Sequence, residues 1–139
     1  MPQDKDPLRK LKDVLERRRT LERLTQLLEG KVLRRTDSNV GGGVSGVFSS
    51  SQKKRALFLF ANGTFRFDTT EFRSVSGGGY SIPSEEKRSF EGTWLVEMVG
   101  EKPALVIRQK ETIIKWWHIE DGGPGVQYLD GERWDRYII

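Results

Sequence analysis

Hydrophobic residues recur at three- and four-residue steps through the first part of the chain. These positions are Leu8, Leu11, Val14, Leu15, Leu21, Leu24, Leu27 and Leu28. At about 100° per residue they cover roughly half of a helical circumference. Asp6 is a suitable N-cap before Pro7, and Gly30 can adopt the left-handed conformation that ends many helices. The pattern predicts one amphipathic helix over residues 7–29.

Three consecutive arginines, Arg17, Arg18 and Arg19, interrupt this stripe. The leucines on either side form a first leucine patch, Leu8, Leu11 and Leu15, and a second leucine patch, Leu21, Leu24 and Leu28. A helix of this length spans about 35 Å, whereas a domain of ~110 residues offers about 25 Å of surface. One end should therefore overhang. We expect the second patch to pack on the parent domain. We expect the first patch, with Arg17 and Arg18, to bind a partner protein or a second copy.

From Lys31 the hydrophobic period changes to two, which is typical of strands. The expected strands are residues 31–35, 56–60, 64–72, 89–98, 104–110, 112–119, 126–129 and 132–138. Asn62-Gly63 predicts a tight hairpin, because both residues tolerate positive φ. The Gly/Ser-rich segment 37–51 is predicted as a loop leading into a weak strand, and 81–87 as an exposed loop.

Short strands separated by turn signals, with no helix among them, are typical of antiparallel barrels and sandwiches. The predicted fold class is mainly β: an antiparallel eight- to nine-stranded meander barrel over residues 31–139, preceded by a helical segment over residues 1–30.

The charge is concentrated in the helical segment. Residues 1–36 hold 11 Lys/Arg and 6 Asp/Glu, whereas residues 37–139 hold 13 and 14. A nearly neutral barrel does not resemble a nucleic-acid groove, so nucleic acid is an unlikely partner. The first residues are charged where a secretory signal would be apolar, and no apolar run approaches a membrane span of about 20 residues. We therefore expect a cytoplasmic protein with no membrane partner.

Gly92-Thr93-Trp94 begins a strand, a strand-turn-strand meander follows, and the last strand carries Arg133 and Arg136. In these features residues 31–139 resemble the lipocalin-like, or calycin, barrels. The resemblance implies that Trp94 closes one end of the barrel and that Arg133 or Arg136 packs across its indole. This chain departs from the family layout because several strands precede the motif, which normally opens the barrel.

A hollow barrel would offer a ligand an interior and rim formed by Trp94, Trp117, Phe65, Phe67, Arg133 and Arg136. Burial of a large indole is a sufficient structural reason for Trp94, independent of any ligand. Trp116 and Trp117 are adjacent, so one should enter the barrel and the other point outward. The outward indole is either covered by the second leucine patch or exposed as part of a binding surface.

Residues 41–46 match the pattern G-x-G-x-x-G, but no helix follows, so a loop at the barrel mouth is the better interpretation. His118 is the single histidine and cysteine is absent, so zinc sets and catalytic triads lack their usual members. We expect no catalytic residue, metal or cofactor, and no enzyme.

The sequence favours a non-catalytic interaction module whose helix docks a partner protein or a second copy. One alternative is a carrier that holds a small apolar ligand in the barrel interior. A further alternative is nucleic-acid binding through the basic helix.

Overall fold

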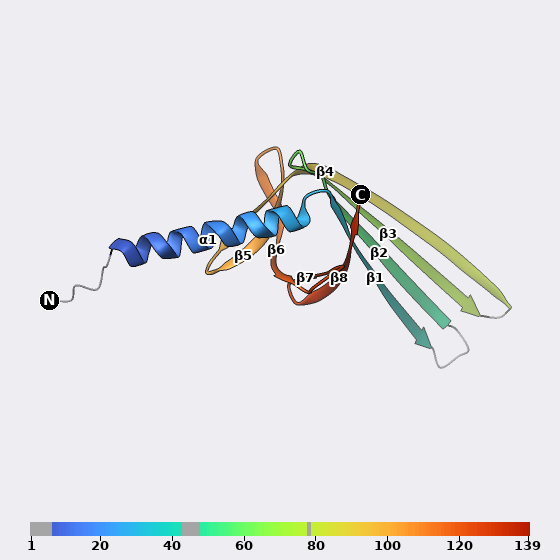
Figure 1. Cartoon of the computed structure of the whole chain (residues 1–139). Helices are drawn as coiled ribbons and strands as arrows, with labels where there is room; N and C mark the ends of the chain where they lie inside the picture. The colour runs from blue at the N-terminus through green and yellow to red at the C-terminus, as the bar shows by residue number, and fades with distance from the viewer. Residues whose placement is uncertain (1–6, 43–47, 78) are drawn as a thin grey trace.

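The fold is one helix followed by a closed eight-stranded antiparallel barrel, which confirms the predicted fold class (Figure 1). The computed structural model describes residues 7–42, 48–77 and 79–139. The elements are α1 (Pro7–Leu28), β1 (Lys31–Gly42), β2 (Phe48–Leu59), β3 (Thr64–Gly77), β4 (Tyr80–Val99), β5 (Lys102–Gln109), β6 (Thr112–Asp121), β7 (Val126–Leu129) and β8 (Glu132–Ile138). Each strand pairs with the next along the chain, and β8 closes the barrel on β1. The proposed helix cap Asp6 lies outside the described residues.

The first four strands are much longer than the barrel needs. β8 pairs with β1 only over Lys31–Arg34, and β5 pairs with β4 only over Thr93–Val99. Beyond these points β1 to β4 pair only with one another among the described residues, and they project from the barrel as a sheet (Figure 1). We call this sheet the arm; it comprises residues 35–42, 48–55, 69–77 and 80–88.

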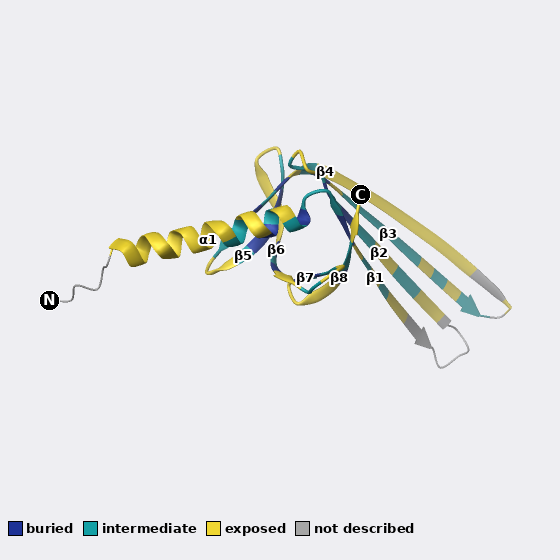
Figure 2. Ribbon diagram, in the orientation of Figure 1, coloured by how far each residue is buried: buried dark blue, intermediate teal, exposed yellow. Residues whose placement is uncertain are grey.

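The arm corrects two sequence predictions. Residues 37–42, 48–51 and 81–87 are strand rather than loop, while residues 43–47 lie outside the described part of the chain. No arm residue whose burial is described is buried (Figure 2). Most of the arm side chains are polar, so these strands lack the period-two hydrophobic signal. Backbone ladders that continue from the barrel are what hold these residues extended.

The barrel interior is filled with apolar side chains. Fourteen buried residues form one cluster: Leu24, Leu28, Leu33, Leu57, Leu59, Phe65, Trp94, Val96, Leu105, Ile107, Trp117, Ile119, Leu129 and Trp134. All but two come from strands, at the alternate positions that face inward. Trp117 is buried and Trp116 remains 42% exposed, which confirms the predicted inward and outward indoles.

The remaining two cluster members, Leu24 and Leu28, come from α1, with Leu21 and Leu27 packed against them. The second leucine patch therefore closes the barrel core rather than covering Trp116, so the covering role considered from the sequence is wrong. Gly30, at φ +71°, joins helix to barrel: its N–H donates to Leu59 O (2.8 Å) and its carbonyl accepts from Ile139 N (3.0 Å).

The hairpin turn predicted at Asn62-Gly63 is present, but its type differs from the two-residue turn that the sequence predicts. Of these two residues, only Gly63 has a positive φ (87°). Phe60 N donates to Thr64 O (2.9 Å), so the loop contains three residues, a common hairpin class that ends in a left-handed glycine.

β4 belongs to both the arm and the barrel, and Gly92 lies where it passes between them. Gly92 pairs with Phe65 on β3, whereas the next residue, Thr93, pairs with Arg108 on β5 as well as with β3. A Cβ on Gly92 would overlap the carbonyl oxygen of Arg108 and lie 2.8 Å from Cε1 of Phe65. The neighbouring strand and ring can approach this closely only because residue 92 has no side chain.

We therefore expect Gly92→Ala to destabilise the fold by about 1–3 kcal/mol, the usual cost of overpacking a rigid site. Urea denaturation of the intact chain measures this. Ser89→Ala, at an exposed position on the same strand, is the control and should change stability by no more than ~0.5 kcal/mol. Equal stability of the two variants would contradict close packing at Gly92.

Candidate functional site

The four aromatic residues predicted to line a ligand cavity all contact the core. Phe65, Trp94 and Trp117 are buried in the interior cluster, and Phe67 packs against it with its ring centroid 6.2 Å from that of Trp117. Trp94 Nε1 donates to Phe60 O (2.9 Å), which satisfies the one polar atom of the indole. These contacts place all four aromatic side chains in or against the interior cluster.

The two arginines of β8 have different surroundings. Arg133 is largely exposed and pairs with Asp135 (3.5 Å). Arg136 is nearly buried: its guanidinium donates to Gly123 O (3.0 Å) and to Gln127 Oε1 (2.8 Å), so it fastens the loop between β6 and β7. These contacts of Arg133 and Arg136 do not involve Trp94.

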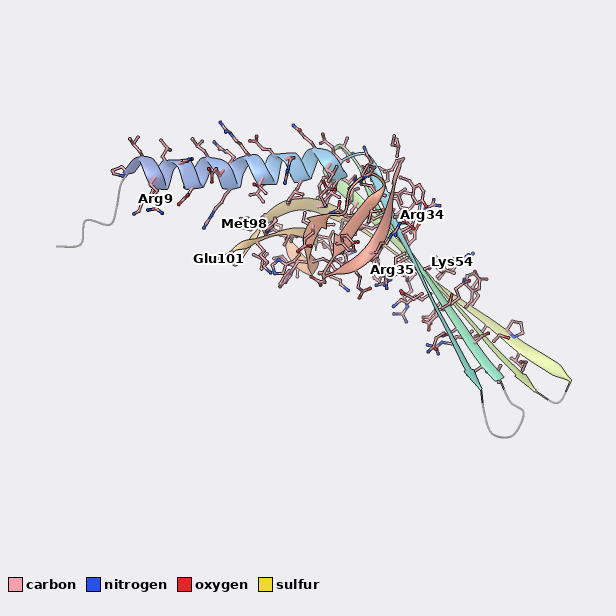
Figure 3. The ribbon with its side chains drawn as sticks, turned by 60° about the horizontal axis from the view of Figure 1, so that its bottom comes forward. Arg9, Arg34, Arg35, Lys54, Met98 and Glu101 are labelled. Carbon is pink, nitrogen blue, oxygen red and sulfur yellow. The ribbon has the colours of Figure 1, made fainter. Side chains whose placement is uncertain are left out.

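The indole that carries a guanidinium is Trp134, over which Cζ of Arg55 lies 4.9 Å from the ring centroid. Arg55 also pairs with Asp37 (2.8 Å), and Arg35 joins Asp37 (3.0 Å) to Glu132 (2.9 Å). This ion network lies where the barrel interior passes into the arm; Figure 3 labels Arg35 at this junction. Arg35 lies two residues after Leu33, and Arg55 lies two residues before Leu57. This spacing is the one sequence signal that places both arginines on the inward face.

Partial burial opposes ionisation of Asp37. The hydrogen bond from Arg55 and the charges of Arg35 and Arg55 outweigh that effect, so the pKa of Asp37 lies below its usual value of 3.8. The carboxylate therefore stabilises the folded chain while it is ionised.

His118 contacts Asp130 and Trp116. Its backbone N–H donates to Asp130 Oδ1 (2.8 Å), and its ring meets the Trp116 ring edge-on at 5.0 Å. The ring borders a groove of about 600 Å³ that α1 helps to form through Thr20 and Arg23. No group of three or more His, Asp or Glu side chains within the described residues is arranged to hold a metal ion.

The N-terminal half of α1 extends beyond the barrel (Figures 1 and 2). Leu8 and Leu11 of the first leucine patch are 75% and 55% exposed, and Leu15 and Val14 are exposed as well. The helix thus overhangs as its length predicts, with the first patch in solvent and the second in the core.

The two leucine patches lie on different faces of the helix. At about 100° per residue, the first patch is centred roughly 150° from Leu24 and Leu28. The barrel-facing side of the overhang is polar. Its residues Asp13, Glu16, Arg17 and Thr20 border a groove of about 430 Å³, whose other side is formed by Met98 of β4, Glu101 of the following turn and Pro103 of β5. Figure 3 shows Met98 and Glu101 beneath α1.

Basic side chains flank the first leucine patch. On the same angular scale Arg18 lies within about 20° of Leu11, while Lys12 and Arg19 lie about 40° from Leu8 and Leu15 respectively. The acidic residues Asp13 and Glu16 are on the barrel side instead. Of the two arginines predicted to bind a partner, Arg18 therefore adjoins the patch and Arg17 does not.

No protein-family model, curated protein or solved structure matches the chain. Its function must therefore be inferred from its own geometry. Within the described part of the chain, no helix has both the length and the apolar character needed to cross a membrane.

Trp94→Ala should reduce the free energy of unfolding by about 3–5 kcal/mol, the range for emptying a buried aromatic site. The change also leaves Phe60 O without its indole donor. Chemical denaturation measures this, with Trp116→Ala as the exposed control, for which we expect a smaller loss. Similar losses at both positions would show that Trp94 does not occupy the core.

Replacing Asp37 should lower stability in a pH-dependent way. Because the folded pKa is depressed, the contribution of Asp37 is present above the unfolded pKa of about 3.8 and is lost as the pH falls through the folded pKa. Urea midpoints of the wild type and Asp37→Asn should therefore differ most near neutral pH and converge under strong acid. A difference that is constant with pH would contradict the ion-pair explanation.

Proposed function

We propose that this chain is a non-catalytic interaction module that binds another protein through the overhanging half of α1. The partner surface that fits best is an amphipathic helix with apolar residues flanked by Asp or Glu. The exposed first leucine patch, bordered by Lys12, Arg18 and Arg19, is the observation that carries the proposal.

The charge of the overhang favours an acidic partner over a second copy of the helix. Residues 7–19 hold six Lys/Arg and two Asp/Glu. Both acids are on the side away from the patch, so two such helices pairing through their leucines would bring basic flanks together. Like charges at close range oppose association, whereas an acidic helix would gain both apolar burial and charge pairing.

The filled barrel interior supports a scaffold role over that of an apolar-ligand carrier. An eight-stranded barrel encloses only enough space for its own side chains or one small ligand. Its strands contribute twelve buried apolar residues to the cluster, and α1 adds Leu24 and Leu28. The barrel then serves to hold the helix at a fixed position.

We further propose kinship with the lipocalin-like barrels. The eight-stranded antiparallel meander and the buried Trp94 after Gly92 support it. The arginine–indole pair differs from the family expectation, since Arg55 of β2 covers Trp134 of β8. This kinship carries no implication of a ligand in the barrel.

The probe for the proposed function is a fluorescein-labelled helical peptide with leucines at heptad a and d positions and glutamates beside them. In fluorescence anisotropy at physiological salt, we expect Leu11→Gln to weaken binding about tenfold or more, a loss of ~1.4 kcal/mol. Ile138→Gln, at an exposed apolar residue of the barrel, should bind as the wild type does.

Two adjacent arginines, Arg18 and Arg17, provide a test variant and a matched control for the contribution of basic charge to peptide binding. Arg18→Glu should weaken peptide binding, whereas Arg17→Glu should change it little, because only Arg18 adjoins the first leucine patch. Circular dichroism checks that both variants fold. If duplex DNA or phosphatidylserine vesicles bind more tightly than the peptide, or if Leu11→Gln has no effect, the proposed function is wrong.

A further inference from the structure

The β1 side of the arm is an open sheet edge. Among the described residues, β1 has a strand partner on this side only up to Arg34, which pairs with Asp135 of β8. At the next residue, the Arg35 guanidinium donates to Arg133 O (2.8 Å) as β8 turns away. Residues 35–42 then pair with β2 alone, leaving about 25 Å of edge at ~3.3 Å per residue.

The outward-facing backbone groups can be assigned from the ladder. Phe60 N donates to Thr64 O across the β2–β3 hairpin, so even-numbered residues at this end of β2 face β3 and odd-numbered ones face β1. The β1–β2 register pairs odd residues with odd residues. Thr36 and Ser38 therefore direct their N–H and C=O groups away from the sheet, toward the open edge.

The opposite edge of the arm, on β4, is protected against pairing. Pro83 removes a donor, and four consecutive charged residues, Glu85 to Arg88, follow it. Nearer the barrel, Gln109 Nε2 donates to Glu91 O (3.0 Å) and satisfies an outward carbonyl. Proline, charge and side-chain cover are the usual means by which proteins prevent edge-to-edge association.

The β1 edge has none of these devices within residues 36–39, whose sequence is Thr-Asp-Ser-Asn. Asp37 is the one charged residue, and Arg35 and Arg55 of the same chain already neutralise it at 3.0 and 2.8 Å. The edge is therefore open to pairing, while the other edge of the same sheet is closed to it.

We propose that two copies of the chain pair antiparallel through their β1 edges, about a two-fold axis at Ser38. The midpoint of the open stretch falls at Ser38–Asn39, so this register uses nearly its full length. It sets Asp37 opposite Asn39 of the second copy, which avoids like charges and supplies an amide donor. The result is one continuous sheet of two arms.

A second copy fits this edge better than an unrelated extended peptide for two reasons. The edge is complementary to itself in register and charge, as a two-fold interface requires. This pairing also covers the unprotected β1 edges of both copies, so that only the protected β4 edges remain exposed at the two sides of the combined sheet. Association therefore stops at a dimer instead of continuing into a filament.

Disulfide trapping tests the register, because the chain contains no cysteine. The pairing puts the two copies of residue 38 opposite each other at a Cα separation of about 5.5 Å, within the range for a disulfide. We expect full-length Ser38→Cys to cross-link under mild oxidation at least tenfold faster than Thr36→Cys, whose opposite residue is not cysteine. Ser89→Cys, on the β4 edge, should behave like Thr36→Cys.

Proline variants test the pairing without a covalent bond. Residue 38 directs its N–H outward, so Ser38→Pro removes an edge donor and spares the β1–β2 ladder. We expect light scattering to show a concentration-dependent dimer for the wild type and for Ser89→Pro, and a monomer for Ser38→Pro with unchanged circular dichroism. Ser89 occupies the equivalent outward position on β4.

Two outcomes would overturn the proposal. One is a wild type that stays monomeric up to millimolar concentration, with equal cross-linking rates for all three cysteine variants. The other is a dimer that persists in Ser38→Pro but is lost in Leu11→Gln, which would place self-association on the helix. The first result does not bear on binding of the acidic peptide, so this proposal can fail while the proposed function stands.

Discussion

The architecture depends on how β4 passes from the arm into the barrel. β4 is 20 residues long; its first part forms the outer strand of the arm, and its last part pairs with β5 in the barrel. At the crossing, Gly92 lets the carbonyl of Arg108 and the ring of Phe65 approach the backbone more closely than any side chain would allow. Two residues later, Trp94 enters the core and bonds Phe60 O. A glycine and a tryptophan at this spacing thus have a structural explanation without any ligand.

The two openings of the barrel are closed by different kinds of interaction. At one, Leu24 and Leu28 of α1 complete the apolar cluster, which fixes the direction in which the helix leaves the barrel. At the other, Arg55 covers Trp134 and is held in turn by Asp37. A cation over an indole contributes roughly 0.5–2 kcal/mol, and the Arg55 charge is balanced by the carboxylates of Asp37 and Glu132. This suits a junction from which a polar sheet must continue.

Much of the fold follows from the sequence because its signals are local. Gly30, Gly63 and the turn at Asp130-Gly131 all have positive φ where turn chemistry predicts a reversal. The helix is predictable from its leucine spacing and its overhang from its length. The arm is not predictable in this way. Its strands face solvent on both sides, so their sequences lack the alternation of apolar and polar residues that predicts a strand. These segments are therefore predicted as loops from the sequence. Hydrogen bonding to the neighbouring strands keeps them extended.

The arginine–indole pair was missed for a related reason. Which guanidinium contacts which indole depends on which strands lie close together in the fold. Arg55 and Trp134 are separated by most of the barrel sequence, so their contact is not a local feature. Spacing could show that Arg55 faces inward, but not that β8 returns beside β1 and brings Trp134 within reach. The family resemblance favoured an arginine of the last strand, whereas the closure of this barrel selects one from β2.

The overhanging helix and the arm leave the barrel on opposite sides in both ribbon orientations (Figures 1 and 3). If copies join through their β1 edges, the two helices therefore lie toward the far ends of the dimer, each held by its own barrel. Under the proposed function, such a dimer would bind two acidic helices of one elongated partner more tightly than a single site would, by up to about 10²–10⁴ where the spacing matches. Where the spacing does not match, no gain results, because the barrel fixes each helix through Leu24 and Leu28. The rigid core would then determine which partners benefit from dimerisation, although it contacts none of them.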